Sequence, residues 1–329
     1  MRSRAEVVSG FSRTLSFALF ALLFLAPSLA VAQDTHVLVI AGVGGDEEHV
    51  KKFDKWAQAV VDAAKKHGVP AANITYLGEN PDQSGGKMKA RVTRENVTKA
   101  LTDLSASAKA LDDIFIMLIG HGSFDGKIGA FNLPGPDLTA DDYASLLKKF
   151  TTQKVTFVNT ASSSGAFIQP LAGPARTIIA ATRTGGERNE TRFAEYFVEA
   201  LDSEAADRDR NGRVSMQEAF DYAAQKVKTA YEQAGTIITE HATIDDSNQG
   251  KLAAMQYLAP ERSRTAAAQA ADPAMRTLLE QRDALEKQVA ELRLKKDTMD
   301  PARYDEELEK LLTDLALKTR AIRDMETKK

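Results

Sequence analysis

Short apolar runs alternate with longer amphipathic segments along the middle of the chain. The apolar runs lie at residues 36–41, 73–77, 114–119, 155–159 and 177–181. The segments in which apolar positions recur at helical spacing lie at residues 47–67, 93–110, 139–150 and 190–201. Strands that alternate with helices predict an α/β fold with an open, mostly parallel sheet between two layers of helices.

Polar residues follow two of the expected strands directly. His121 and Gly122 come after the strand at 114–119, and Ser162 follows the strand at 155–159 within a serine-rich run. The carboxyl ends of parallel strands meet at one edge of the sheet, where ligands bind. We therefore expect His121 and Ser162 to meet there. The alternative is that neither segment is catalytic: the glycines around His121 would then form a tight turn, and the serine run would be an ordinary loop.

The sequences around these strands resemble the legumain family of peptidases, which has a caspase-like fold. Residues 37–70 resemble the opening strand and helix of that family. The segment IMLIGHGS at 116–123 resembles its catalytic-histidine segment, and VTFVNTASSSG at 155–165 resembles its nucleophile strand. The resemblance covers roughly residues 35–200 and implies a caspase-like three-layer sandwich.

The resemblance also implies roles for single residues, with clear departures. His121 matches the catalytic histidine, and the N–H groups of Gly122 and Ser162 match the oxyanion hole. Ser162 stands where the family has its cysteine nucleophile. The family's asparagine after the first strand corresponds to Gly44, and its acidic residue before the nucleophile corresponds to Thr160. Specificity for asparagine therefore has no support in this sequence.

The chain contains no cysteine, which excludes disulfides, thiolate metal sites and a cysteine nucleophile. A thiol with a pKa of ~8.5 supplies some thiolate at neutral pH, whereas a serine hydroxyl needs a base in hydrogen-bond contact. Two hypotheses follow. The favoured one is a pseudo-peptidase that keeps the peptide-binding scaffold; the alternative is an active serine endopeptidase with a Ser162–His121 dyad. Asp125 or Glu187 could orient His121, and their spacing does not distinguish between them.

Residues 207–218, DRDRNGRVSMQE, match the twelve-residue EF-hand calcium loop at each diagnostic position. Gly212 permits the sharp turn of such a loop. The expected ligands are Asp207, Asp209, Asn211, Arg213 through its carbonyl, Ser215 and Glu218. Arginines within the loop add positive charge beside the ion. The pattern therefore predicts a weak, structural Ca²⁺ site.

The other polar candidates are weaker. On the first expected helix, His49 is expected to be exposed and Trp56 to lie in the core. His241 with Asp245 and Asp246 has the composition of a metal site, although a polar surface loop is the favoured interpretation.

Residues 1–32 have the order of basic, apolar and small residues that is typical of a secretory signal peptide. A membrane anchor is the alternative, but Pro27 and the triplet Ala30-Val31-Ala32 favour cleavage. The absence of cysteine excludes a lipoprotein and fits the bacterial periplasm. We therefore expect a periplasmic protein that meets the membrane only through its cleaved signal peptide.

The expected organisation after the signal peptide has three parts. A caspase-like domain at 33–258 is followed by a linker at 259–272 and a helical hairpin or coiled coil at 273–329. The hairpin is interpreted either as a solvated appendage or as a device for oligomerisation or partner binding. A net charge of −3 argues against a nucleic-acid partner. The resemblance to the legumain family implies a peptide or protein ligand.

Overall fold

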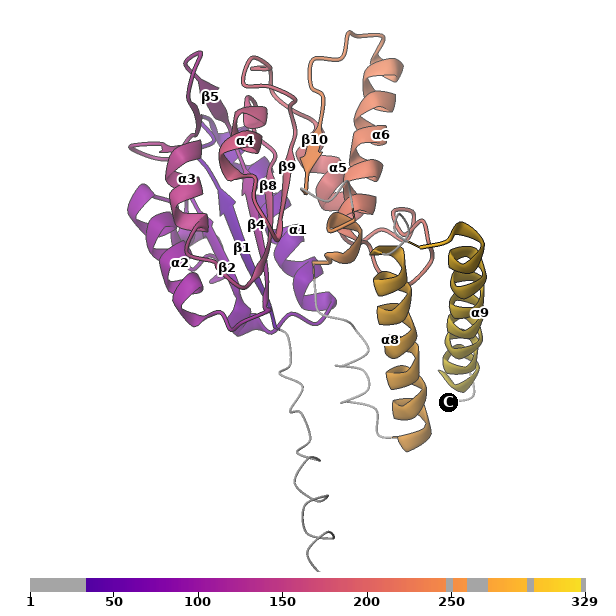
Figure 1. The fold of residues 1–329 in the computed structure, drawn as a ribbon. Coiled ribbons are helices and arrows are strands. Elements are labelled where there is room, and N and C mark those ends of the chain that lie inside the picture. Colours follow the sequence, from indigo (N-terminus) through magenta and orange to yellow (C-terminus); the bar gives the residue numbers. More distant parts are fainter. Residues whose placement is uncertain (1–33, 247–250, 259–271, 295–298, 327–329) are drawn as a thin grey trace, which may run out of the picture. The chain divides into compact units, whose positions relative to one another are not determined.

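A computed structural model describes residues 34–246, 251–258, 272–294 and 299–326 (Figure 1). The predicted signal peptide and nearly all of the predicted linker lie outside the described residues. Within the described ranges, the structure has no helix that combines the length and the apolar character needed to span a membrane.

A seven-stranded sheet forms the centre of the α/β body, with the strand order β10-β9-β8-β4-β1-β2-β3. Its strands are β1 (Thr35–Ala41), β2 (Ile74–Gly78), β3 (Ala90–Arg91), β4 (Asp113–Ile119), β8 (Lys154–Asn159), β9 (Arg176–Ala180) and β10 (Thr243–Asp245). All neighbouring strands are parallel except β9 and β10. The predicted α/β class is confirmed, and the mostly parallel sheet is consistent with a caspase-like fold.

Helices cover both faces of this sheet and make three layers (Figure 1). One face packs against α1 (Glu47–Lys66), α5 (Phe193–Ala200) and α6 (Met216–Ala234). The other packs against α2 (Arg94–Ser107), α3 (Ala140–Leu147) and α4 (Ile168–Leu171). Alternate residues of each strand enter opposite cores, as with Val39 and Ile40 of β1. The 3₁₀ turns are η1 (Ala71–Asn73), η2 (Pro81–Gln83), η3 (Ser164–Phe167) and η4 (Ala253–Met255).

The central strands are apolar along their whole length because both of their faces are covered. Strand β4 lies between β1 and β8, and its residues from Ile114 to Ile119 are all buried. Such a strand fixes the positions of the residues that follow it. His121 lies two residues beyond its end.

A separate antiparallel sheet follows β4. It consists of β5 (Gly122–Phe124), β6 (Gly129–Phe131) and β7 (Leu138–Thr139) in that order. This sheet was not predicted from the sequence. Its strands have two or three residues each, which is too short for an alternating pattern to be visible.

The C-terminal part contains two long helices, α8 (Pro273–Leu294) and α9 (Pro301–Glu326). Met275 and Leu279 of α8 pack against Ile322 of α9, so the start of one helix meets the end of the other. The backbone N–H of Arg303 donates to Asp300 Oδ1 at 3.0 Å, so Asp300 caps the start of α9. The two helices are therefore an antiparallel pair.

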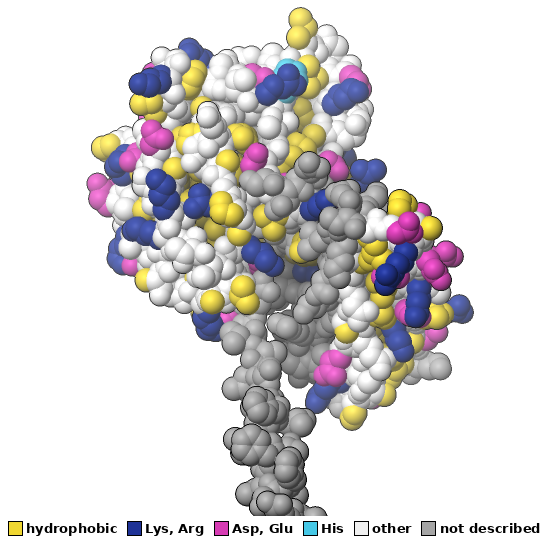
Figure 2. Space-filling model, in the orientation of Figure 1, with side chains coloured by type: hydrophobic (Ala, Val, Ile, Leu, Met, Phe, Trp, Pro, Cys, Tyr) yellow, Lys and Arg dark blue, Asp and Glu magenta, His cyan; other side chains and the backbone are white. Residues whose placement is uncertain are grey.

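On the face of the α/β body seen in Figure 2, acidic and basic side chains are interspersed.

Candidate active site and metal loop

His121 and Ser162 lie beyond the carboxyl ends of the neighbouring strands β4 and β8. Both line a small pocket, here called the Ser162 pocket. Its lining consists of Phe53 and Trp56 from α1, Gly120 and His121, Thr160 and Ser162, and Glu190, Thr191 and Ala194. The free volume is about 10 Å³, which is room for about one water molecule. The structure thus brings the two predicted residues to one pocket.

The hydroxyl of Ser162 is held by the backbone of Gly122. Ser162 Oγ donates to the Gly122 carbonyl oxygen at 3.0 Å and accepts from the Gly122 N–H at 3.3 Å. Ser162 is only 7% exposed. Among the described residues, no hydrogen bond joins Ser162 Oγ to the ring of His121. The hydroxyl is therefore bonded to backbone and not to a base.

Gly122 has no room for a side chain. A Cβ at this position would overlap the carbonyl oxygen of Ser162 and come within 3.2 Å of the Ala161 Cβ. The residue also opens β5, where it is paired with Phe131 of β6. The small sheet and the end of β8 approach each other closely because this position is glycine.

The turn after β8 is tight and mostly buried. Ser163 has a left-handed φ of 57°, and its N–H donates to the carbonyl oxygen of Glu187 at 2.8 Å. Its buried Oγ has no hydrogen-bond partner within the part of the chain that the structure describes. Ser164 Oγ lies 3.3 Å from Thr182 Oγ1. These contacts fix the serine run against the segment that follows β9.

His121 is held by contacts that the sequence analysis did not identify. Its Nε2 lies 3.2 Å from the carbonyl oxygen of Gly44. Its ring centroid is 5.1 Å from that of Phe53 and 5.0 Å from that of His49. Gly44 is the position that the resemblance assigns to an orienting asparagine. Here a backbone carbonyl makes the polar contact to the histidine.

Neither of the two carboxylates proposed to orient His121 forms a hydrogen bond or ion pair with it among the described residues. Asp125 Oδ1 accepts from the N–H groups of Lys127 and Ile128 in the turn between β5 and β6. Glu187 Oε1 lies 2.9 Å from Nδ1 of His241. His121 has no carboxylate partner among the described residues.

A cluster of charged residues lies beside His121 and was not predicted from the sequence. His49 Nδ1 lies 2.7 Å from Asp46 Oδ2, and His49 Nε2 lies 3.5 Å from Glu190 Oε1. The same Glu190 oxygen accepts from Lys52 Nζ at 2.5 Å. The expectation that His49 is exposed was wrong, because its side chain is 23% exposed and packs on His121. Trp56 is only partly buried and lines the pocket.

These contacts set the charges of the cluster. The hydrogen bond that the Asp46 carboxylate accepts from the His49 ring raises the pKa of His49. Burial acts to raise the pKa of Glu190, but the Lys52 ammonium and His49 together hold that pKa below its usual value. Glu190 is therefore ionised at neutral pH.

Replacing Asp46 with asparagine is expected to lower the pKa of His49, because the anionic partner is lost while asparagine still caps α1. An NMR titration of the His49 ring measures this directly. In the wild type, the midpoint is expected above the ordinary 6.5. Glu47→Gln is the matched control, because Glu47 pairs with Lys51. An unchanged His49 midpoint in Asp46→Asn would contradict the assignment.

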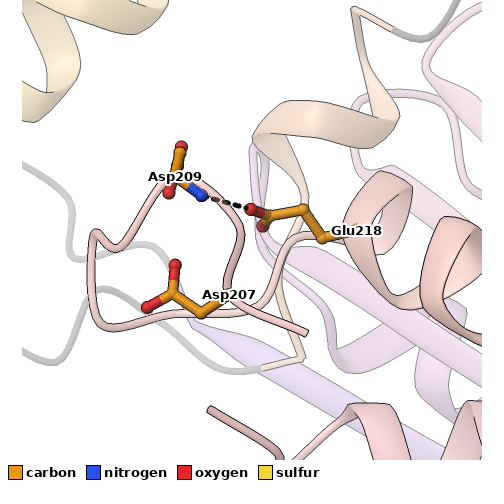
Figure 3. Close-up of side chains that lie close together, drawn as sticks. All are labelled: Asp207, Asp209 and Glu218. Carbon is orange, nitrogen blue, oxygen red and sulfur yellow. Dashed lines mark hydrogen bonds between the residues drawn. The ribbon is translucent and has the colours of Figure 1, made fainter. Parts of the chain in front are cut away.

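In the loop at 207–218, three carboxylates converge (Figure 3). Oxygens of Asp207, Asp209 and Glu218 lie within 4.8 Å of one another. Glu218 Oε1 accepts from the N–H of Asp209 at 3.2 Å, and Oε2 accepts from Ser215 Oγ at 2.7 Å. Hard oxygen donors of this kind suit Ca²⁺. The donor set therefore fits a calcium ion.

The remaining predicted ligands are held within the loop. Asn211 Oδ1 accepts from the N–H of Arg213 at 2.9 Å, and Ser215 caps α6. Gly212 has a φ of 82°, as the predicted sharp turn requires. Ser215 forms a β-bridge with Tyr257, and the Arg213 guanidinium lies 3.5 Å from the centroid of the Tyr257 ring. The loop is thus fastened to a nearby segment of the same chain.

One comparison with known proteins, the match to a family model, agrees with the resemblance. The profile of the peptidase C13 family, which is the legumain family, matches residues 88–259, just over half of the chain. A search of curated proteins found no match. Among solved structures, a crystal structure of a Geobacter sulfurreducens protein is 12% identical, with a TM-score of 0.44, and the match covers 64% of this chain and 92% of that chain. On the extent of the family match, the chain belongs to the peptidase C13 family.

Proposed function

We propose that the protein is an exported, calcium-binding pseudo-peptidase that keeps a peptide-binding site at the carboxyl edge of the sheet. The observation that carries this proposal is the hydrogen bonding of the Ser162 hydroxyl. It donates to the Gly122 carbonyl oxygen and accepts from the Gly122 N–H. A serine becomes nucleophilic only when a base accepts its proton in direct contact. His121 lines the same pocket without making that contact.

The same bonding affects the predicted oxyanion hole. An oxyanion hole needs N–H donors that are free to bind the developing negative charge. The Gly122 N–H instead donates to Ser162 Oγ. A substrate carbonyl would have to displace the hydroxyl before it could use this donor. Ser162 Oγ, the expected nucleophile, and the Gly122 N–H, an expected oxyanion donor, are therefore hydrogen-bonded to each other.

An active serine endopeptidase is the second candidate, because Ser162 and His121 line one pocket. In that reaction, Ser162 Oγ would attack the scissile carbonyl carbon while His121 accepts the hydroxyl proton. His121 would then donate that proton to the leaving amine, and water would hydrolyse the acyl-enzyme. Catalytic hydrogen bonds often tighten only when substrate binds. This candidate therefore needs Ser162 to leave Gly122 when substrate binds.

Digestion of an unbiased peptide mixture with calcium present distinguishes the two functions. The chain from Gln33 onward is compared with Ser162→Ala and Ser162→Cys. The pseudo-peptidase predicts no cleavage by the wild type and gained cleavage by Ser162→Cys, since a thiolate needs no base in contact. Ser107→Cys, which places an exposed thiol at the end of α2, is the matched control. Cleavage by the wild type that disappears in Ser162→Ala would support the serine peptidase instead.

We also propose that loop 207–218 binds Ca²⁺ and that export places it in a compartment that supplies the ion. Asp207, Asp209 and Glu218 would hold the ion, which would fix the loop and the start of α6.

The C-terminal helix pair is proposed to engage a protein partner or a second copy of this chain.

Replacing Glu218 with glutamine is expected to weaken calcium binding by about tenfold or more, because one of three convergent carboxylates loses its charge. Glutamine can still take part in the capping box with Ser215. Isothermal titration calorimetry with CaCl₂ measures the change. Glu204→Gln, at an exposed position outside the loop, serves as the control. Equal calcium affinities for Glu218→Gln and the wild type would exclude the site.

A further inference from the structure

The Ser162 pocket carries the features of a site for a cationic side chain. Glu190 and Trp56 both line it, so a carboxylate lies beside an aromatic face. Carboxylates bind ammonium and guanidinium groups by charge-assisted hydrogen bonds, and an indole face attracts the same cations. Phe53 adds a further apolar surface against which an aliphatic stem can pack.

One lysine of the chain already makes both interactions. Lys52 Nζ lies 2.5 Å from Glu190 Oε1 and 5.1 Å from the centroid of the Trp56 ring. Lys52 and Trp56 are one helical turn apart on α1, whereas Glu190 comes from the segment before α5. The lysine shows which chemical group the carboxylate and the indole accept together.

We propose that the Ser162 pocket binds a lysine or arginine side chain of a peptide ligand, and that Lys52 occupies the cation position until the ligand displaces it. The inference rests on the proposed function, because it assumes that this edge of the sheet binds peptides. It assigns the ligand's basic residue to the pocket formed by Trp56 and Glu190.

Displacement of Lys52 is physically reasonable. Its side chain is 36% exposed and that of Glu190 is 48% exposed, so their ion pair borders water. Exposed ion pairs stabilise a protein little, and the lysine stem can rotate into solvent. The free volume of about 10 Å³ is too small for a ligand side chain. A ligand must therefore open the pocket, and exchange of one cation for another leaves Glu190 paired.

His49 is the other titratable group at Glu190. Its Nε2 is 3.5 Å from the same oxygen that binds Lys52, and its Nδ1 faces Asp46. Glu190 therefore lies between two basic side chains of α1. A basic ligand side chain can therefore take the place of Lys52 at this carboxylate, which would repel an acidic one.

The emission of Trp56 provides a direct binding assay, because this is the only tryptophan in the chain. Acetylated pentapeptide amides with a central arginine, lysine or citrulline are titrated into the protein with calcium present. Citrulline matches the shape of arginine without its charge. The arginine and lysine peptides are expected to change the emission saturably, and the citrulline peptide is expected to bind about tenfold more weakly.

Variants test each part of the inference. Lys52→Ala removes the competitor and is expected to tighten binding of the arginine peptide by about tenfold, whereas Glu190→Gln is expected to weaken it by about tenfold. Lys51→Ala is the matched control, because Lys51 lies next to Lys52 on the same helix but pairs with Glu47 and not with Glu190. Its affinity is expected to equal that of the wild type.

The outcomes separate this inference from the proposed function. Equal affinity for arginine and citrulline peptides, or an unchanged affinity in both Lys52→Ala and Glu190→Gln, would overturn the basic-residue site while leaving a peptide-binding groove. Cleavage by Ser162→Cys at residues other than lysine and arginine would have the same meaning. If no peptide binds any variant and Ser162→Cys cleaves nothing, the peptide-binding function itself is wrong, and the inference with it.

Discussion

Phe157→Ala is expected to lower the free energy of unfolding by about 3–5 kcal/mol. Phe157 belongs to β8 and is fully buried. Its ring centroid lies 5.4 Å from that of Tyr143 and 6.5 Å from that of Phe167. Alanine would leave a cavity among these rings, and the surrounding rigid strands can collapse into it only in part. Urea unfolding followed by circular dichroism measures the loss.

The matched control for this change is a large apolar residue outside the core. Ile128, in the turn between β5 and β6, is 40% exposed. Ile128→Ala is expected to change the unfolding free energy by about 0.5 kcal/mol or less. A loss below about 1 kcal/mol for Phe157→Ala would contradict the packing of β8 against α3 and the turn after β8.

Gly122→Ala is expected to cost about 1–3 kcal/mol of stability and to displace Ser162. The added Cβ would overlap the carbonyl oxygen of Ser162, and no flexible side chain end is present there to move aside. Either β5 or the end of β8 must shift, which lengthens both hydrogen bonds between Gly122 and Ser162. Urea unfolding gives the cost, and a crystal structure of the variant gives the displacement.

Gly173→Ala provides the comparison for the glycine substitution itself. A Cβ there would meet its nearest neighbour, the Arg176 side chain, at 3.6 Å, an ordinary contact distance. Gly173→Ala is expected to leave the unfolding free energy within about 0.5 kcal/mol of the wild type. Equal stabilities for Gly122→Ala and Gly173→Ala would show that β5 and β8 are not in close contact.

The main strands were predictable because each leaves a strong local signal. The five expected strands correspond to β1, β2, β4, β8 and β9, which are apolar runs between helices. Strand β10 and the short strand β3 complete the sheet, but with three and two residues they have no periodicity of their own. Their positions depend on pairing with strands that are distant in sequence.

The same distinction holds for the candidate site. His121 and Ser162 were predictable because strand order alone brings them to one edge. The pairing of Lys52 with Glu190 was not, because 138 residues separate the two positions. The carboxylates of loop 207–218 are local and were found from spacing. The contact of Arg213 with Tyr257 depends on tertiary packing and left no signal in the sequence.

Phosphorylation by diisopropyl fluorophosphate tests most directly whether Ser162 is activated as a nucleophile. Diisopropyl fluorophosphate forms a covalent adduct with serine hydroxyls that a neighbouring base has activated. The chain from Gln33 onward is incubated with the reagent and calcium, and intact mass spectrometry measures the adduct. We expect the mass of the wild type to remain unchanged, as in Ser162→Ala. A stoichiometric adduct on the wild type that is lost in both Ser162→Ala and His121→Ala would contradict the pseudo-peptidase and establish a working serine–histidine dyad.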